Sequence, residues 1–187
     1  MSQQRHRNIR WPVACVLVLS FAGCTDFGGT QLHMTLNAGV IASVDGEHYE
    51  LFATVNGSAV SLKRFIIQNE PSSAGLAVKT VLDFDPPYSR LGVTDSLDSN
   101  GLLQGGISFR LPLDLSSATE VFATIELDGE SDPAPSRTVV FQGTLRAVSR
   151  GTISAILVDS VLSSVRRTNT ELGTITLVLP DDGINGL

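Results

Sequence analysis

The 187-residue sequence is poor in the residues that usually mark chemistry: it has two cysteines, three histidines and one tryptophan. Cys15 lies inside an N-terminal apolar run and Cys24 lies at its end, so the rest of the chain has no cysteine. A domain without a second cysteine cannot form an internal disulfide, and zinc needs three or four Cys, His or carboxylate ligands. With only His33 and His48 beyond residue 24, the sequence argues against disulfide, redox and zinc chemistry.

A membrane-spanning stretch is also missing. The apolar run WPVACVLVLSFAG, residues 11–23, is shorter than the roughly 20 residues that a membrane-spanning helix needs. It follows a segment without acidic residues that carries Arg5, Arg7 and Arg10. A basic start, a short apolar core and small residues at the exit are typical of a secretory signal peptide. The sequence therefore predicts export.

The end of this run, Phe21-Ala22-Gly23-Cys24, resembles the bacterial lipobox, in which an aliphatic residue, a small residue and Gly or Ala precede the cysteine. Phe21 departs from the usual Leu, whereas the other three residues fit. The resemblance implies cleavage before Cys24, a diacylglycerol on its thiol and an acyl chain on its new amino group. An ordinary signal peptide with an incidental cysteine, or an uncleaved anchor, remains the alternative.

We therefore expect a lipoprotein signal peptide at 1–23, a lipidated flexible tether at 24–30 and one β domain at 31–187. Two or more acyl chains hold a protein firmly at a membrane, whereas one chain holds it only marginally. Thr25 follows the cysteine, where many inner-membrane lipoproteins have Asp. We expect the mature protein at the outer membrane, on its periplasmic face or at the cell surface.

Basic side chains are scarce beyond the signal peptide. Residues 24–187 contain ten basic and nineteen acidic side chains, which gives a net charge of −9. Nucleic-acid binding depends on neutralising phosphates with Lys and Arg. The sequence therefore argues against nucleic acid and against anionic lipid as partners of the acidic surface. The expected partners are the membrane, through the lipid on Cys24, with another envelope protein as a further candidate.

Short alternating strands dominate what is present. In residues 48–55, Tyr, Leu, Ala and Val alternate with His, Glu, Phe and Thr. Asp45-Gly46 precedes this strand and Asn56-Gly57 follows it, and Asn-Gly between alternating runs is a strong hairpin signal. The sequence thus predicts a hairpin from Tyr49 to Ile67.

Further apolar, β-branched runs follow at regular spacing, separated by turn-forming segments: GLAVKTVLDF, GISFRLPLDL, EVFATIEL, RTVVFQGTL, GTISAILV and LGTITLVL. Only residues 153–167 also fit a helical face, and their β-branched content favours a strand. The pattern predicts an all-β fold, namely a single immunoglobulin-like antiparallel β-sandwich of about eight strands.

Two blocks resemble the extracytoplasmic C-terminal domain of anti-sigma-K factors. In YELFATVNGSAVSLKRF, residues 49–65, Phe52 replaces the family's Trp and Lys63 stands where Gly is frequent; the matching residues are Tyr49, Leu51, Val60, Ser61, Leu62 and Phe65. In VFATIELDGESDPAPSRTVVFQGTL, residues 121–145, Leu127 replaces a Pro; the matching residues are Glu126, Gly129, Ser131, Pro135, Ser136 and Gly143. The sigma-binding segment and the transmembrane helix of that family are not found, so the resemblance implies the sandwich fold and not the regulatory activity.

Two acidic loops suggest calcium, because hard cations bind several oxygens from a short segment. DGESDP offers Asp128, Glu130 and Asp132 at alternate positions, and the alternative is a solvated turn. SLDSNG places Asp98 and Asn100 before Gly101, but Ser96 occupies the first ligand position and Ile107 stands where a bidentate Glu is needed.

No catalytic motif is evident. Hydrolysis needs a nucleophile beside a base, and the sequence singles out no serine for His33 or His48. We expect His48 to be an exposed residue at a strand edge. Tyr88, in DPPYSR, is the best exposed aromatic for stacking on a sugar, or a packing residue.

These observations predict no catalytic residue, no metal and no cofactor. The expected function is that of a non-enzymatic, lipid-anchored envelope protein that serves as a protein-interaction or structural module. The alternative is a ligand-binding or sensory module for carbohydrate or calcium. An enzyme is the third class, and it would need a pocket that joins His33 or His48 to a serine and a carboxylate.

Overall fold

A computed structural model defines the fold for most of the chain beyond residue 28. It describes residues 29–37, 39–70, 78–85, 89–94, 96–97, 103–104, 106–130, 134–160 and 170–180. The predicted signal peptide and Cys24 lie outside the described residues.

The described residues form thirteen β-strands. In chain order they are β1 (Thr30–Leu36), β2 (Glu47–Val55), β3 (Ser58–Glu70), β4 (Val78–Asp83), β5 (Arg90–Thr94), β6 (Ser96–Leu97), β7 (Leu103–Gln104), β8 (Ile107–Leu111), β9 (Ala118–Leu127), β10 (Val139–Thr144), β11 (Arg146–Ser149), β12 (Thr152–Asp159) and β13 (Glu171–Val178).

Main-chain hydrogen bonds join eleven of these strands into one antiparallel sheet, in the order β5-β4-β3-β2-β9-β10-β12-β13-β1-β8, with β11 paired to β12. β6 and β7 form a separate two-stranded ribbon. The predicted all-β, antiparallel class is confirmed. The immunoglobulin-like sandwich of about eight strands is not confirmed, because the hydrogen bonds define one continuous sheet instead of two.

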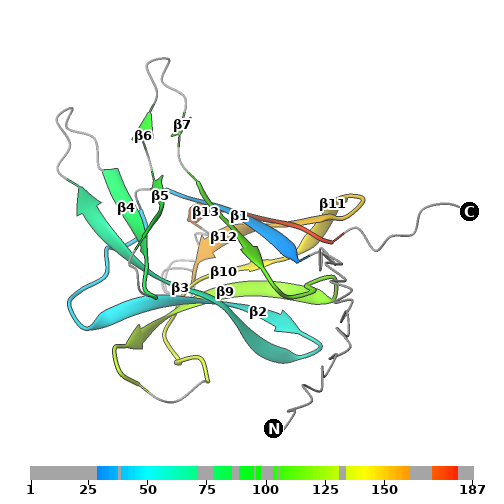
Figure 1. Cartoon of the computed structure of the whole chain (residues 1–187), viewed down its shortest axis with the longest axis horizontal. Helices are drawn as coiled ribbons and strands as arrows, with labels where there is room; N and C mark the ends of the chain where they lie inside the picture. Colours follow the sequence, from blue (N-terminus) through cyan, green and yellow to red (C-terminus); the bar gives the residue numbers. More distant parts are fainter. Residues whose placement is uncertain are drawn as a thin grey trace, which may run out of the picture.

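The long sheet curls over on itself, so that β1, β12 and β13 lie above β2, β3 and β9 (Figure 1). Its two terminal strands, β5 and β8, come into contact. A Cβ atom at Gly92 in β5 would lie 2.4 Å from the carbonyl oxygen of Gly106, just before β8. The absence of a side chain at Gly92 therefore permits this close approach of the two ends.

The core fills the space between the two layers. Alternation along β1 buries Leu32, Met34 and Leu36, as expected when one face of a strand packs inward. The ring of Tyr49 stacks on Phe65 at 5.5 Å and on Phe141 at 6.3 Å between ring centroids. Contacts between strands so far apart in the sequence hold the curled sheet together.

The predicted hairpin is confirmed. Val55 of β2 pairs with Ser58 of β3, and Asn56 and Gly57 have φ angles of 51° and 80°. Positive φ at both central residues is the requirement of the two-residue turn that matches strand twist. Residues 152–159 form a strand as predicted, and residues 161–169 lie outside the described part of the chain.

The first strand begins where the tether was expected to end. Thr30, the last residue of the expected tether, is the first residue of β1 and is completely buried. Its main-chain N–H and its hydroxyl both donate to the carbonyl oxygen of Leu113, at 3.1 and 2.8 Å. Within the described part of the chain, no helix is long and apolar enough to cross a membrane.

Candidate functional site

The structure describes four of the candidate site residues, namely His33, His48, Asp128 and Glu130. The other candidates lie outside the described residues: Cys24, Tyr88, Asp98, Asn100, Gly101 and Asp132. Ile107, which occupies the position of a calcium-binding Glu in the second loop motif, is buried in the core. It is therefore a packing residue.

His48 is not exposed, contrary to the sequence-based expectation. It lies on the outer side of β2, is 4% exposed and stacks on Phe84 with 4.0 Å between ring centroids. Its Nδ1 lies 2.9 Å from Oδ1 of Asp128. The guanidinium of Arg64 covers the Phe84 ring at 5.3 Å and pairs with Asp85. Phe84, which follows β4 and packs against β2, is what buries the imidazole.

Asp128 has a structural role in the turn after β9. Its carboxylate bonds to His48, and its main-chain N–H donates to the carbonyl of Gly46 at 2.9 Å. Glu130 is exposed, and its N–H donates back to Leu127 at 3.2 Å. Among the described residues, no three His, Cys, Asp or Glu side chains come close enough to hold a metal ion. Calcium binding stays a prediction, since Asp132 is outside this set.

A buried carboxylate, that of Glu126, lies on the same outer surface. Glu126 is 7% exposed and accepts hydrogen bonds from the main-chain N–H of Ser136, at 2.8 Å, and from the hydroxyl of Thr124. The hydroxyl of Ser136 donates to the carbonyl of Ile125 at 2.8 Å. The connection between β9 and β10 is thereby fixed over β9. Both Glu126 and Ser136 belong to the second resemblance block, which was the only signal in the sequence for this contact.

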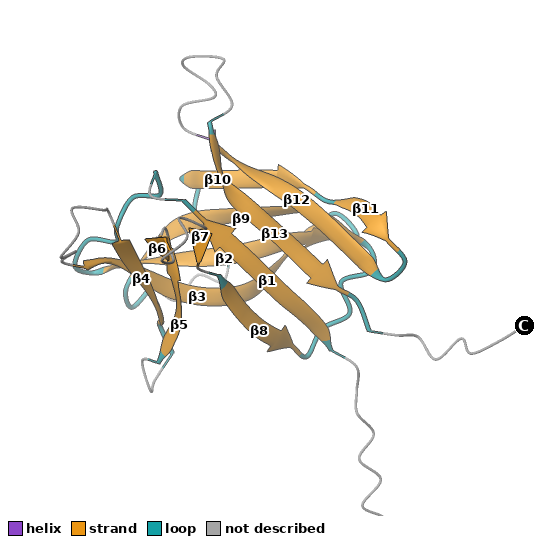
Figure 2. Ribbon diagram, turned by 90° about the horizontal axis from the view of Figure 1, so that it is seen from above, coloured by secondary structure: helices purple, strands orange, loops and turns teal. Residues whose placement is uncertain are grey.

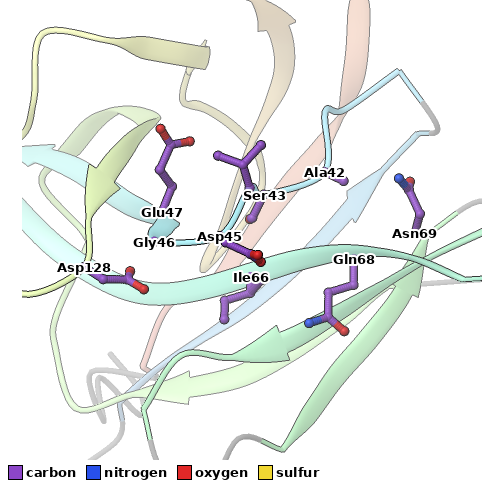
Figure 3. Close-up of a pocket in the computed structure, with 10 residues that line it drawn as sticks. Ala42, Ser43, Asp45, Gly46, Glu47, Ile66, Gln68, Asn69 and Asp128 are labelled. Carbon is purple, nitrogen blue, oxygen red and sulfur yellow. The ribbon is translucent and has the colours of Figure 1, made fainter.

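An open pocket of about 350 Å³ lies beside Asp128, at the end of the sheet where β1 leads into β2. Its lining is formed by the β1–β2 connection, by β3 and by Asp128: Ala42, Ser43, Val44, Asp45, Gly46, Glu47, Ile66, Gln68, Asn69 and Asp128. Figure 3 shows Asp45 and Asp128 on neighbouring segments, with Gln68 and Asn69 farther along. We call this the pocket end of the sheet, and the opposite end, where β1 begins, the Thr30 end.

Exposed apolar side chains border this pocket. Val44 lines it and is 60% exposed, Ile41 precedes its first lining residue and is 67% exposed, and Leu127 adjoins Asp128 and is 60% exposed. Together with Asp45 and Glu47 they give the pocket end a mixed acidic and apolar surface. Such a surface suits a partner that is partly apolar and partly basic.

His33 lies on a different surface, with a serine. Its Nδ1 is 2.7 Å from the hydroxyl of Ser108 on the neighbouring strand β8, and both residues are exposed. Its ring lies against Gly106, where a Cβ atom would be 2.7 Å from Cε1. Among the described residues, no hydrogen bond joins His33 to a carboxylate. The elements of a Ser–His–Asp arrangement are thus divided, with His33 and Ser108 on one surface and His48 and Asp128 on another.

The curled sheet has two outer surfaces, which differ in burial. The covered surface is formed by β3, β2 and β9 and includes His48, Phe52, Thr124 and Glu126. The open surface is formed by β8, β1, β13, β12 and β11, which lie side by side in Figure 2. Its outward side chains are exposed or half-buried.

Comparisons of the chain with family models, with curated proteins and with solved structures find no match.

Proposed function

We propose that this protein is an exported, lipid-anchored envelope protein whose β domain is a non-enzymatic binding or structural module. One observation supports the anchor beyond the lipobox. The folded sheet begins at Thr30, only six residues after Cys24, and Thr30 is fixed by hydrogen bonds to Leu113. An anchor at Cys24 would therefore hold the domain directly at the membrane. The outer membrane is the proposed destination.

The proposed role of the domain is to bind another envelope protein at the pocket end. The support is the mixed surface of Val44, Leu127, Asp45 and Glu47. A non-enzymatic role is supported by the separation of His33 and Ser108 from Asp128. In addition, β1 is paired on both sides, with β8 and β13, so its N–H groups are engaged in the sheet and offer no free donor to an oxyanion at Ser108.

Kinship with the anti-sigma-K extracytoplasmic domain, and with immunoglobulin-like sandwiches, is also a proposal. It is supported by the burial of Tyr49, Leu51 and Phe65 and by the contact of Glu126 with Ser136. An experimental structure of such a domain in which equivalent strands follow the order β3-β2-β9-β10 would support it. A different strand order would exclude it.

Metabolic labelling with a palmitate analogue tests the anchor. The full chain should incorporate the label and fractionate with membranes, and Cys24→Ser should lose both properties. A wild-type chain that takes up no more label than Cys24→Ser would refute the anchor. Thr25→Ser, which keeps the lipobox, is the matched control.

Photo-crosslinking in the native membrane tests the interaction. A crosslinker at Leu127 should yield one discrete adduct that Val44→Asp weakens several-fold. A crosslinker at Ile156, equally apolar and exposed but on the open surface, should not yield the same adduct. Identical adducts from both positions would contradict a partner site at the pocket end.

A further inference from the structure

The open surface has a composition unlike that of the rest of the molecule. Strand register arranges its outward side chains in rows across the sheet: Arg110–Gln31–Val178–Thr152–Ser149, then Ser108–His33–Thr176–Ser154–Arg146, then Thr35–Thr174–Ile156. None of these side chains is acidic, although residues 24–187 contain nineteen acidic and ten basic side chains. The ionised groups of these three rows are arginines, which lie among many hydroxyl groups. The next outward residue of β13, Glu171, is acidic and exposed and lies toward the pocket end.

The hydroxyl groups form short cross-strand contacts. The Thr35 and Thr174 hydroxyls are 2.8 Å apart, and Ser154 lies 3.3 Å from Thr176 while donating to the carbonyl of Ile175. These contacts keep the side chains close to the sheet. The result is a broad surface of short side chains from which arginines and a few apolar groups project.

Apolar side chains project from this surface into solvent. Ile156 is 58% exposed and Val178 is 45% exposed, and Val148, at the β11 edge, is 63% exposed. A strand residue that points outward on a sheet with no facing layer has no structural need to be apolar. Exposed apolar groups beside arginines and hydroxyls are typical of a surface that rests at the boundary between lipid headgroups and acyl chains.

The open surface includes the start of β1, which is close to Cys24 in the sequence. Its first row includes Gln31, the second residue of β1, and Arg150 lies in the turn beyond this row. Thr30 is the sixth residue after Cys24, and the six Cα–Cα steps between them span at most about 20 Å. A lipid on Cys24 would therefore keep the first row within one tether length of the bilayer.

We propose that the open surface is the membrane-facing surface of the domain and rests on anionic phospholipid. This inference rests on the proposed lipid anchor at Cys24. Arg146 and Arg150 lie against headgroup phosphates, and Ile156 and Val178 lie at the headgroup–acyl boundary.

The distribution of charge fits this orientation. Many acidic groups of the described residues lie on the covered surface and at the pocket end, among them Asp45, Glu47, Glu50, Glu126 and Asp128. The strands of the open surface carry Glu171 and Asp159, both at their pocket ends. An anionic bilayer repels these groups and attracts the arginines, so both effects turn the domain the same way. Among the described residues, the carboxylates toward the Thr30 end are those of Asp114 and Glu120. Glu120 lines a pocket together with Arg146 and Ile156. The pocket end then faces away from the membrane, where a partner can reach it.

Fluorescence quenching by lipid tests the orientation. The full chain, produced and processed in bacteria, is reconstituted in vesicles of phosphatidylethanolamine and phosphatidylglycerol that contain brominated lipid. A bimane probe is placed on Ile156→Cys or Val178→Cys, and on Val44→Cys or Leu127→Cys as controls of similar exposure at the pocket end. The probes at 156 and 178 should be quenched at least twofold more strongly than those at 44 and 127. Equal quenching at all four positions would overturn the proposal.

The unsubstituted chain separates this proposal from the anchor. If Cys24 is lipidated, the unsubstituted chain has no free thiol and takes up no probe, whereas probe on Cys24 refutes the anchor itself. Anchored protein with equal quenching refutes only the orientation.

Charge variants give a second test. Arg146→Gln with Arg150→Gln should lower quenching at position 178 about twofold in anionic vesicles and leave it unchanged in phosphatidylcholine vesicles. Arg137→Gln, an exposed arginine near the pocket end, is the matched control. An equal effect of Arg137→Gln would mean that net charge acts in place of this surface, and would also overturn the proposal.

Discussion

The covered and open surfaces belong to the same curled sheet and each carries one histidine, but the histidine is buried on the covered surface and exposed on the open surface. On the covered surface, His48 lies beneath Phe84 and bonds to Asp128. On the open surface, His33 is exposed and bonds only to the hydroxyl of Ser108 among the described contacts. Polar groups on the covered surface thus contribute to the stability of the fold, whereas those on the open surface are available to a partner. Mutations should therefore affect stability on the covered surface and binding on the open surface.

The largest difference should come from apolar residues that point outward on the two surfaces. Phe52 points away from the core, yet it is 2% exposed and stacks on Phe122 with 5.4 Å between ring centroids. Phe52→Ala should lower the free energy of unfolding by about 3 kcal/mol, because a large buried ring is removed. Ile156→Ala, on the open surface, should change it by less than about 0.5 kcal/mol. Urea unfolding followed by circular dichroism measures both, and equal losses would remove the distinction between the surfaces.

A second test uses pH to separate buried from accessible polar groups. Burial, with a smaller contribution from the charge of Glu47, raises the pKa of Tyr49 to about 12, and its hydroxyl donates to the carbonyl of Ile41 at 2.7 Å. Below pH 10 the phenol is neutral in both the folded and the unfolded state. Between pH 10 and 12 the unfolded state releases the proton first, so stability should fall by about 2–3 kcal/mol as pH rises through this range.

Tyr49→Phe is the control for that measurement. It should lose about 1 kcal/mol at neutral pH with the hydrogen bond to Ile41, and it should show a flatter decline above pH 10. Lysine and arginine titrate in both proteins, so the difference between the two curves isolates Tyr49. Parallel curves from pH 9 to 12 would contradict the raised pKa.

Local sequence signals were sufficient to predict the elements whose structure depends on residues that are neighbours in the chain. Asn56-Gly57 specifies its own turn, as predicted, and the alternation along β2 places Tyr49 and Leu51 inward. The number of strands in the sheet was not predictable in this way. It depends on register between strands that are far apart in the chain. The approach of the two ends of the sheet depends in the same way on the distant contact between Gly92 and Gly106.

The same reason explains the error about His48. Its flanking residues suggest an exposed strand edge, and nothing near it in sequence indicates that Phe84 will cover it. The contact between His33 and Ser108 was equally hidden, because 75 residues separate the two. The alternation in the sequence indicates which residues point outward from the sheet, but not which of these residues the fold will cover.

The smallest expected effect tests the comparison most directly, because it compares the removal of one histidine with the removal of the other. His48→Ala removes a buried ring, its stack on Phe84 and its bond to Asp128, and should cost about 1–2 kcal/mol. His33→Ala removes an exposed ring and should change stability by less than about 0.5 kcal/mol. Both values come from urea unfolding at pH 7.

A double-mutant cycle then shows how His48 acts. Asp128 is 42% exposed, so solvent screens its attraction to the imidazole, and the coupling between His48→Ala and Asp128→Asn should be well below 1 kcal/mol. Most of the loss in His48→Ala then comes from uncovering Phe84, and His48→Phe should recover part of it although it cannot bond to Asp128. A coupling that accounts for the whole loss, with no recovery in His48→Phe, would instead make the pair with Asp128 the reason that this surface is closed.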